Sequence, residues 1–147
     1  MQEEIGLRGA EMIARRIKPN IAIVTDVTHD TQTPMINKFV QGDVSCGKGP
    51  CVTVGPAVHN KLLDLVQDVA EKRKIPLQLE TAFKGTGTDT DSFAYVNEGC
   101  PSVLISIPLR YMHTTVEMLH VSDIESTIQL MYEVLLTLSP KTDLKYM

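Results

Sequence analysis

The chain has 147 residues, of which 43% are hydrophobic and 22% are charged, and this composition predicts one globular domain, residues 1–147, able to bury roughly 68% of its unfolded surface. Its formal net charge of −4 argues against nucleic acid as a partner, because phosphates are neutralised by clustered Lys and Arg. The chain has neither a basic region followed by an apolar stretch at its start nor an apolar run near the ~18 residues of a membrane span, so we expect a soluble, cytoplasmic protein.

Two adjacent carboxylates, Glu3 and Glu4, stand ahead of any predicted strand. A run of mostly β-branched residues, 21–25, is typical of a strand buried on both faces, and it ends at Asp26. Between the glutamates and this strand, apolar residues recur at helical spacing up to Pro19, which predicts a short amphipathic helix with the stripe Leu7, Ala10, Ile13, Ala14 and Ile17.

The middle of the chain predicts a loop, a strand, a helix and a second strand. The loop is long and polar, and loops of this length in compact domains are often functional. The second strand alternates apolar with polar side chains and should be half-buried. In chain order these elements are the loop 28–48, the strand 51–54, the helix 58–74 and the alternating strand 77–83.

The last third of the chain predicts two helices and a strand. A glycine-rich turn leads into a short helix at 91–97, and a buried strand follows at 102–107. A capping box of Ser122 and Glu125 opens the final helix, which ends before Pro140.

Strands that alternate with helices predict an α/β fold, here a three-layer sandwich with a mostly parallel or mixed sheet flanked by helices. Ligands of such sheets bind beyond the carboxyl ends of the strands. Asp26 follows the first predicted strand, Asp89 follows the alternating strand, and His113 follows the last strand. We therefore expect these three residues to gather at one rim of the sheet.

Glu4, Asp26 and His113 together offer the carboxylate and imidazole ligands that suit zinc, cobalt or manganese. Neighbouring residues in extended backbone point in opposite directions, so Glu3 and Glu4 need not share a role: one can bind metal while the other handles a proton. Each residue also has a structural interpretation: acids favoured at a helix start, a turn aspartate and a loop histidine. Asp89 is suited to capping the helix that follows it.

Four segments carry a pattern with more specific meaning: QEEIGLRGA at 2–10, DVTH at 26–29, GTD at 87–89 and ISIPLRYMH at 105–113. In order and spacing, over essentially the whole chain, they resemble the tetrahedral di-metal aminopeptidases. Members of this family are named glutamyl aminopeptidase or, in some cases, endoglucanase (cellulase M). The resemblance implies a zinc-exopeptidase-like fold and a hydrolase that removes N-terminal residues from peptides.

By this resemblance Glu3 is the general base, Glu4 binds one of two divalent metal ions, zinc or cobalt, and Asp26 binds the other. His113 is a further ligand. The metals polarise the scissile carbonyl and activate a water, and Glu3 takes its proton.

Members of this family also carry a long upstream portion with a metal-binding histidine, a bridging aspartate and an assembly domain. We therefore expect this chain to be the C-terminal part of such an enzyme, truncated at the N-terminus, with a partial or empty metal site and little or no activity alone. Its expected partners are peptides, the missing N-terminal segment and further copies of the chain, and neither nucleic acid nor a membrane. Asp89 and Arg110 are weaker candidates for contact with substrate.

Two other functions stay open. An endo-1,4-glucanase also uses two carboxylates, which lie roughly 5 to 9.5 Å apart, although the chain has no tryptophan and only 5% aromatic residues with which to build a sugar platform. A non-catalytic module, structural or partner-binding, is the function expected if the missing ligands are never supplied.

Overall fold

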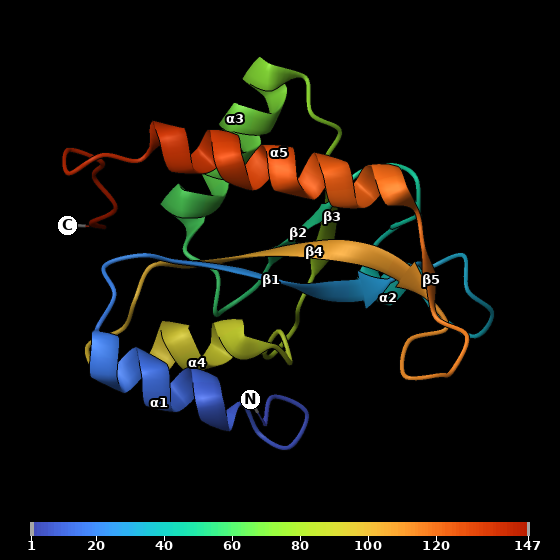
Figure 1. Cartoon of the computed structure of the whole chain (residues 1–147), viewed down its shortest axis with the longest axis horizontal. Helices are drawn as coiled ribbons and strands as arrows, with labels where there is room; N and C mark the ends of the chain where they lie inside the picture. Colours follow the sequence, from blue (N-terminus) through green and yellow to red (C-terminus); the bar gives the residue numbers. More distant parts are fainter. Residues whose placement is uncertain (1, 147) are drawn as a thin grey trace.

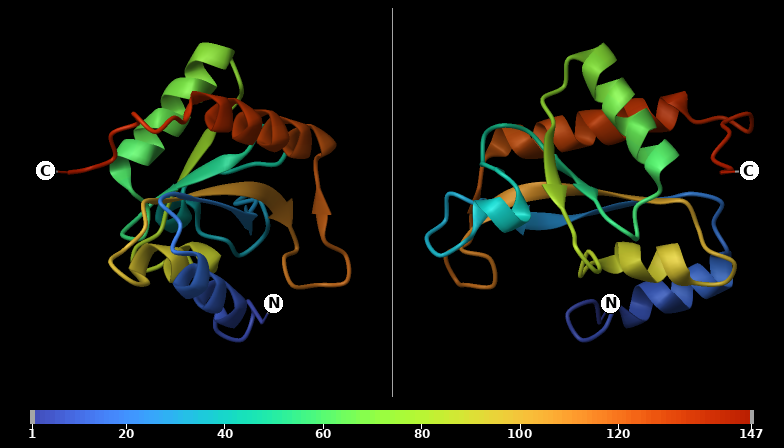
Figure 2. Two further views of the ribbon diagram at one scale, coloured as in Figure 1. Left: turned by 60° about the vertical axis from the view of Figure 1, so that its left-hand side comes forward. Right: turned by 180° about the vertical axis from the view of Figure 1, so that it is seen from behind.

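A five-stranded sheet with helices on both faces forms the centre of the computed structural model, which describes residues 2–146. Helices α3 (Asn60–Arg73) and α5 (Val121–Thr137) lie on one face, and α1 (Arg8–Ile17) and α4 (Asp89–Tyr95) lie on the other (Figure 1). Figure 2 shows the same three layers from two further directions. The predicted α/β sandwich is therefore confirmed. None of the described helices is long and apolar enough to cross a membrane.

The sheet is mixed. Its strands run in the order β1 (Ala22–His29), β4 (Ser102–Arg110), β2 (Cys51–Val54) and β3 (Gln78–Thr81), and the short β5 (Met118–Leu119) also pairs with β4. β1 is parallel to β4 and β3 is parallel to β2, whereas β2 and β4 are antiparallel. The carboxyl ends of β1 and β4 therefore meet at one edge, and that of β3 points to the opposite edge. We predicted that Asp89 would lie at the same rim as Asp26 and His113 because it follows a strand parallel to theirs. This reasoning is wrong, since β3 runs in the opposite direction.

β1 is longer than the sequence predicted. It continues past residue 25 because β4 pairs with all eight of its residues, from Ala22 opposite Ser102 to His29 opposite Leu109. Asp26 consequently lies inside the strand and does not terminate it.

The main hydrophobic core lies between the sheet and the helices α3 and α5. Strands β2 and β4 send Val52, Val103 and Ile105 to this side, because successive side chains of a strand point to opposite faces. The other buried members of the core are Val58, Leu62, Leu63, Val66, Val69, Ala70, Ile75, Leu130 and Val134.

The opposite face of the sheet, toward α1 and α4, is rich in polar side chains. Asp26 pairs with Ser106, Ser106 pairs with Cys51, and Thr53 pairs with Glu80. Since paired residues share a face and every second residue of a strand does too, polar residues from all four of the strands β1, β4, β2 and β3 lie on this face. The polar face is defined by Asp26, Thr28, Thr53, Glu80 and Ser106.

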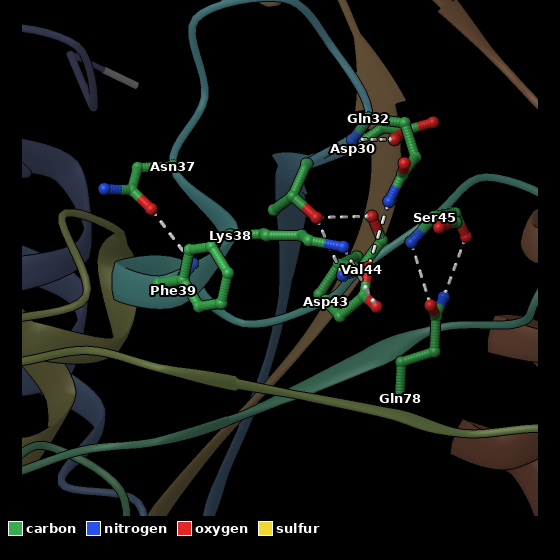
Figure 3. Close-up of polar contacts among 10 residues, drawn as sticks. Asp30, Gln32, Asn37, Lys38, Phe39, Asp43, Val44, Ser45 and Gln78 are labelled. Carbon is green, nitrogen blue, oxygen red and sulfur yellow. Dashed lines mark hydrogen bonds and ion pairs between the residues drawn. The ribbon is translucent and has the colours of Figure 1, made fainter.

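The predicted long loop contains the short helix α2 (Lys38–Gln41) and is fixed by hydrogen bonds (Figure 3). The side-chain amide of Gln32 donates to Asp43 Oδ1 at 2.9 Å. The amide of Gln78 in β3 accepts from the Ser45 N–H at 2.9 Å and donates to the Ser45 carbonyl at 3.0 Å. These bonds hold the loop against the edge of the sheet, so that α2 contacts β3.

The start of α5 differs from the prediction. The side chain of His120 caps this helix, because its Nδ1 accepts a hydrogen bond from the Ser122 N–H at 3.3 Å. The predicted capping box of Ser122 and Glu125 is therefore wrong, although the helix itself is confirmed. An upstream side chain satisfies the same free N–H group that the capping box would have satisfied.

Asp123, in the first turn of α5, ties the helix to the loop before β2. Its buried carboxylate accepts from the N–H of Gly47 at 2.7 Å and from the N–H of Gly49 at 2.8 Å. We expect Asp123→Ala to lower the free energy of unfolding by about 2–3 kcal/mol, since bonds to a charged acceptor are lost and a buried N–H is left unpaired. Urea denaturation measures this change. Exposed Asp64→Ala is the control, and an equal loss there would contradict the assignment.

Candidate functional site

Four residues singled out from the sequence line one cavity of about 240 Å³. Glu3 and Glu4 come from the segment before α1, Asp26 from β1, and His113 from the loop between β4 and β5. This loop extends from the sheet on the side where α1 lies (Figure 1). The structure thus brings together residues from three separate segments of the chain.

Glu4 and His113 approach each other within this cavity. Glu4 Oε1 lies 3.4 Å from His113 Nε2, with the two side chains 73% and 68% exposed. The backbone of His113 is left-handed, with φ of 62°, and its N–H donates to the carboxylate of Glu117. A polar contact this exposed contributes little to stability. The approach of Glu4 to His113 is therefore not explained by a contribution to the stability of the fold.

Negative charge is concentrated around Glu3 and Asp26. Desolvation raises the pKa of Glu3 above its usual range, and the charges of Asp26, Glu4 and Asp89 raise it further. Burial also raises the pKa of Asp26, and the charges of Asp89 and Glu4 raise it further. The Val27 N–H, which donates to Asp26 Oδ1 at 2.8 Å, lowers this pKa in part. Repulsion of this kind favours the uptake of a proton or of a cation.

The donor chemistry of the cavity fits a divalent metal, since carboxylates and imidazole are ligands that zinc and cobalt accept. Within residues 2–146, no three His, Cys, Asp or Glu side chains lie close enough together to hold a metal ion. The described part of the chain therefore offers ligands of the right kind in an incomplete set.

Asp89 and Arg110, the weaker candidates, lie outside this cavity. Asp89 begins α4 and lines a separate cavity of about 240 Å³ beside α1 and Phe93, and its buried Oδ1 has no hydrogen-bond partner among the described residues. Its charge nevertheless acts on Glu3. The Arg110 guanidinium lies over the ring of Tyr111, with 5.2 Å between Cζ and the ring centroid. Asp89 therefore influences the first cavity only from a distance.

A second cavity, of about 310 Å³, adjoins the first, and the two share the lining residues Val27, Thr28, His29, Thr86 and Thr88. Glu80 of β3 lies in this second cavity. Its Oε1 accepts a hydrogen bond from Thr53 Oγ1 at 2.6 Å, and its Oε2 accepts one from Thr28 Oγ1.

The sequence analysis missed Glu80. The sequence marked Glu80 only as a polar position of an alternating strand, whereas in the structure Leu79 is 52% exposed and Glu80 is half-buried. β3 is an edge strand, so Leu79 has little to pack against, while Glu80 faces hydroxyl groups of two other strands. The partners that draw Glu80 inward belong to distant segments and leave no local signal.

The chain is similar to known aminopeptidases over most of its length. The model of the M42 glutamyl aminopeptidase family matches residues 1–130. A lysyl aminopeptidase from Pyrococcus furiosus is 41% identical over 140 residues, which are 95% of this chain. The crystal structure of a TET aminopeptidase from a marine sediment Thaumarchaeota archaeon superimposes with a TM-score of 0.88, at 35% identity over 96% of this chain.

An assembling relative is also similar in structure. The TET1 peptidase of Pyrococcus horikoshii can assemble into a tetrahedron or a large octahedral shell, and it superimposes with a TM-score of 0.74 at 30% identity over 92% of this chain. The chain spans only part of each relative: 40% of the P. furiosus protein, 40% of the Thaumarchaeota chain and 38% of the P. horikoshii chain.

Proposed function

The chain belongs to the M42 glutamyl aminopeptidase family, and we propose that it supplies part of the active site of a metal-dependent aminopeptidase that removes N-terminal residues from peptides. The observation that carries this proposal is the convergence of Glu3, Glu4, Asp26 and His113 on one cavity. Local sequence cannot produce this convergence, because the residues come from three separate segments.

Each residue has a role in the proposed reaction. Glu4 and His113, whose Oε1 and Nε2 atoms are 3.4 Å apart, would hold metal in this cavity, and Asp26 would contribute a further carboxylate ligand. A divalent metal bound there polarises a carbonyl and lowers the pKa of water. Glu3 lines the same cavity and, within residues 2–146, pairs with no Lys, Arg or His. Its carboxylate accepts the proton of the attacking water and passes it to the leaving amine.

Asp89 favours action at a free N-terminus. It is not among the proposed metal ligands, and its charge acts on Glu3. A carboxylate that metal does not take up attracts a peptide's α-ammonium group, whereas the neutral amide of an internal residue is not attracted. This supports an exopeptidase.

We propose that the remaining metal ligands come from outside residues 2–146. The ligand set of the described chain is incomplete, and the relatives are more than twice as long. The exposed apolar side chains of α1, namely Met12, Ile13 and Ile17, suit a surface that further polypeptide covers. Self-association of the chain accords with the shells that the P. horikoshii relative forms.

A chimera provides the complete enzyme needed to test the proposal. In it, this chain replaces the matching 40% of the P. furiosus relative. We expect the chimera to hydrolyse aminoacyl p-nitroanilides. A chelator should lower the rate of hydrolysis about 100-fold or more, and added zinc or cobalt should restore it. Cleavage of cellulose in the presence of chelator would instead support an endo-1,4-glucanase. A folded but inactive chimera would support a non-catalytic module.

A further inference from the structure

The carboxylate of Glu80 is oriented but not neutralised. Hydroxyl groups of Thr28 in β1 and Thr53 in β2 each donate to one of its oxygens, which leaves a further lone pair on each oxygen for another donor. Within residues 2–146, no Lys, Arg or His pairs with Glu80, and the described lining of the second cavity contains neither Lys nor Arg. The second cavity thus contains an oriented carboxylate, that of Glu80, which no described cation neutralises.

Ser106 adds a second, independent sign of a ligand. It lies on the polar face in the central strand β4, is 0% exposed and lines the second cavity. Its Oγ has no hydrogen-bond partner among the described residues. Buried hydroxyl groups in native proteins are nearly always paired, so a bound group that donates to Ser106 is the simplest explanation.

The walls of the second cavity suit an alkyl chain. Leu104, Val27, Val40 and Phe83 line it together with the hydroxyl groups. The loop that carries α2 is fixed beside β3, where Thr81 Oγ1 donates to the Val40 carbonyl at 3.2 Å. A charged head on a flexible alkyl stem packs its stem on such walls and presents its head to a carboxylate.

We infer that the second cavity is a specificity pocket for a basic N-terminal residue, Lys or Arg, whose cationic head binds Glu80 and donates to Ser106. The inference rests on the proposed function, because the shared residues such as Thr28 and Thr86 connect the pocket to the cavity of Glu3 and Glu4. A substrate whose N-terminus lies in the first cavity thereby places its first side chain in the second. An acidic first residue is disfavoured, because its carboxylate would meet Glu80.

Binding of amino-acid amides to the 147-residue chain tests this pocket without catalysis. With chelator present, L-lysinamide is titrated against L-norleucinamide, which has the same stem without the ammonium, and chemical shifts of backbone amides are followed by NMR. We expect lysinamide to shift Thr53 and Ser106 and to bind about 10-fold or more tightly than norleucinamide, since a charge-assisted bond is added. Equal binding of the two amides by the wild-type chain would overturn the inference.

Glu80→Gln should remove this preference, while Glu98→Gln, which changes an exposed carboxylate outside both cavities, should keep it. In the chimera, Glu80→Gln should lower the ratio of kcat/KM for lysyl over leucyl p-nitroanilide about 10-fold or more, with metal content unchanged. Hydrolysis without a preference for lysine would overturn the inference and leave the proposed function standing. Preferential binding of lysinamide by a chimera that hydrolyses nothing would overturn the proposed function and support the pocket for a basic side chain.

Discussion

Glu3→Gln is expected to lower the kcat of the chimera by a factor of about 10² to 10⁴, because a general base contributes on that order to hydrolysis. Glutamine keeps the size and shape of the side chain, but its amide does not take up a proton as a carboxylate does. Glu3 lines the cavity without ion-pairing to His113, so its loss should leave the metal in place. The measurement pairs steady-state hydrolysis of aminoacyl p-nitroanilides with metal content per chain.

Glu98→Gln is the matched control, since it removes one exposed carboxylate outside the cavity. Wild-type activity in Glu3→Gln would remove Glu3 from the proposed mechanism. A loss of metal that parallels the loss of activity would make Glu3 a ligand and not a base.

His113→Ala is expected to weaken zinc or cobalt binding and to lower kcat/KM, each by about 100-fold or more. Replacing a residue that only hydrogen-bonds to a metal ligand typically lowers metal affinity or activity about 10- to 100-fold. Replacing the ligand itself should lower them by at least as much. Glu4→Gln should have the same paired effect, because Glu4 Oε1 lies 3.4 Å from His113 Nε2. Competition with a chelator of known affinity measures the first quantity, and hydrolysis at saturating metal measures the second.

The control for His113 is His120→Asn, which removes an imidazole while asparagine preserves the cap of α5. Unchanged metal affinity in His113→Ala would exclude this histidine from the metal centre. The contrast with Glu3→Gln separates the two roles, since one variant should lose metal and chemistry together and the other chemistry alone.

The fold was predictable because its strongest signals are local. The mostly β-branched run before Asp26 places β1, and the final helix predicted to end before Pro140 matches α5. Strand direction was not predictable in the same way. Nothing within residues 51–54 or 77–83 records that β2 and β3 run antiparallel to β4, because that pairing depends on long-range contacts.

Part of the candidate site was predictable, because residue type is also a local signal. Glu3, Glu4, Asp26 and His113 stood out because their residue types suit metal chemistry, and the structure places all four around one cavity. Glu80 gave no such signal. Its environment is built from hydroxyl groups of two other strands, and a glutamate in an alternating strand reads from sequence as a solvated side chain.

The polar face of the sheet connects the two proposals. Asp26 in β1 and Glu80 in β3 lie on this same face, and Ser106 lies on β4, between their strands in the order of the sheet. The face thus offers metal-binding chemistry at β1 and a carboxylate for a basic side chain at β3. The opposite face of the sheet is committed to the hydrophobic core with α3 and α5.

The central claim is that this chain supplies metal ligands, and anomalous diffraction from crystals of the zinc-loaded chimera tests it most directly. The account predicts a zinc peak within about 2.0–2.2 Å of ligand atoms of Glu4 and His113, with Asp26 bound to the same or a second ion. Full activity with no zinc peak at these side chains, or with zinc held only by residues outside this chain, would contradict it.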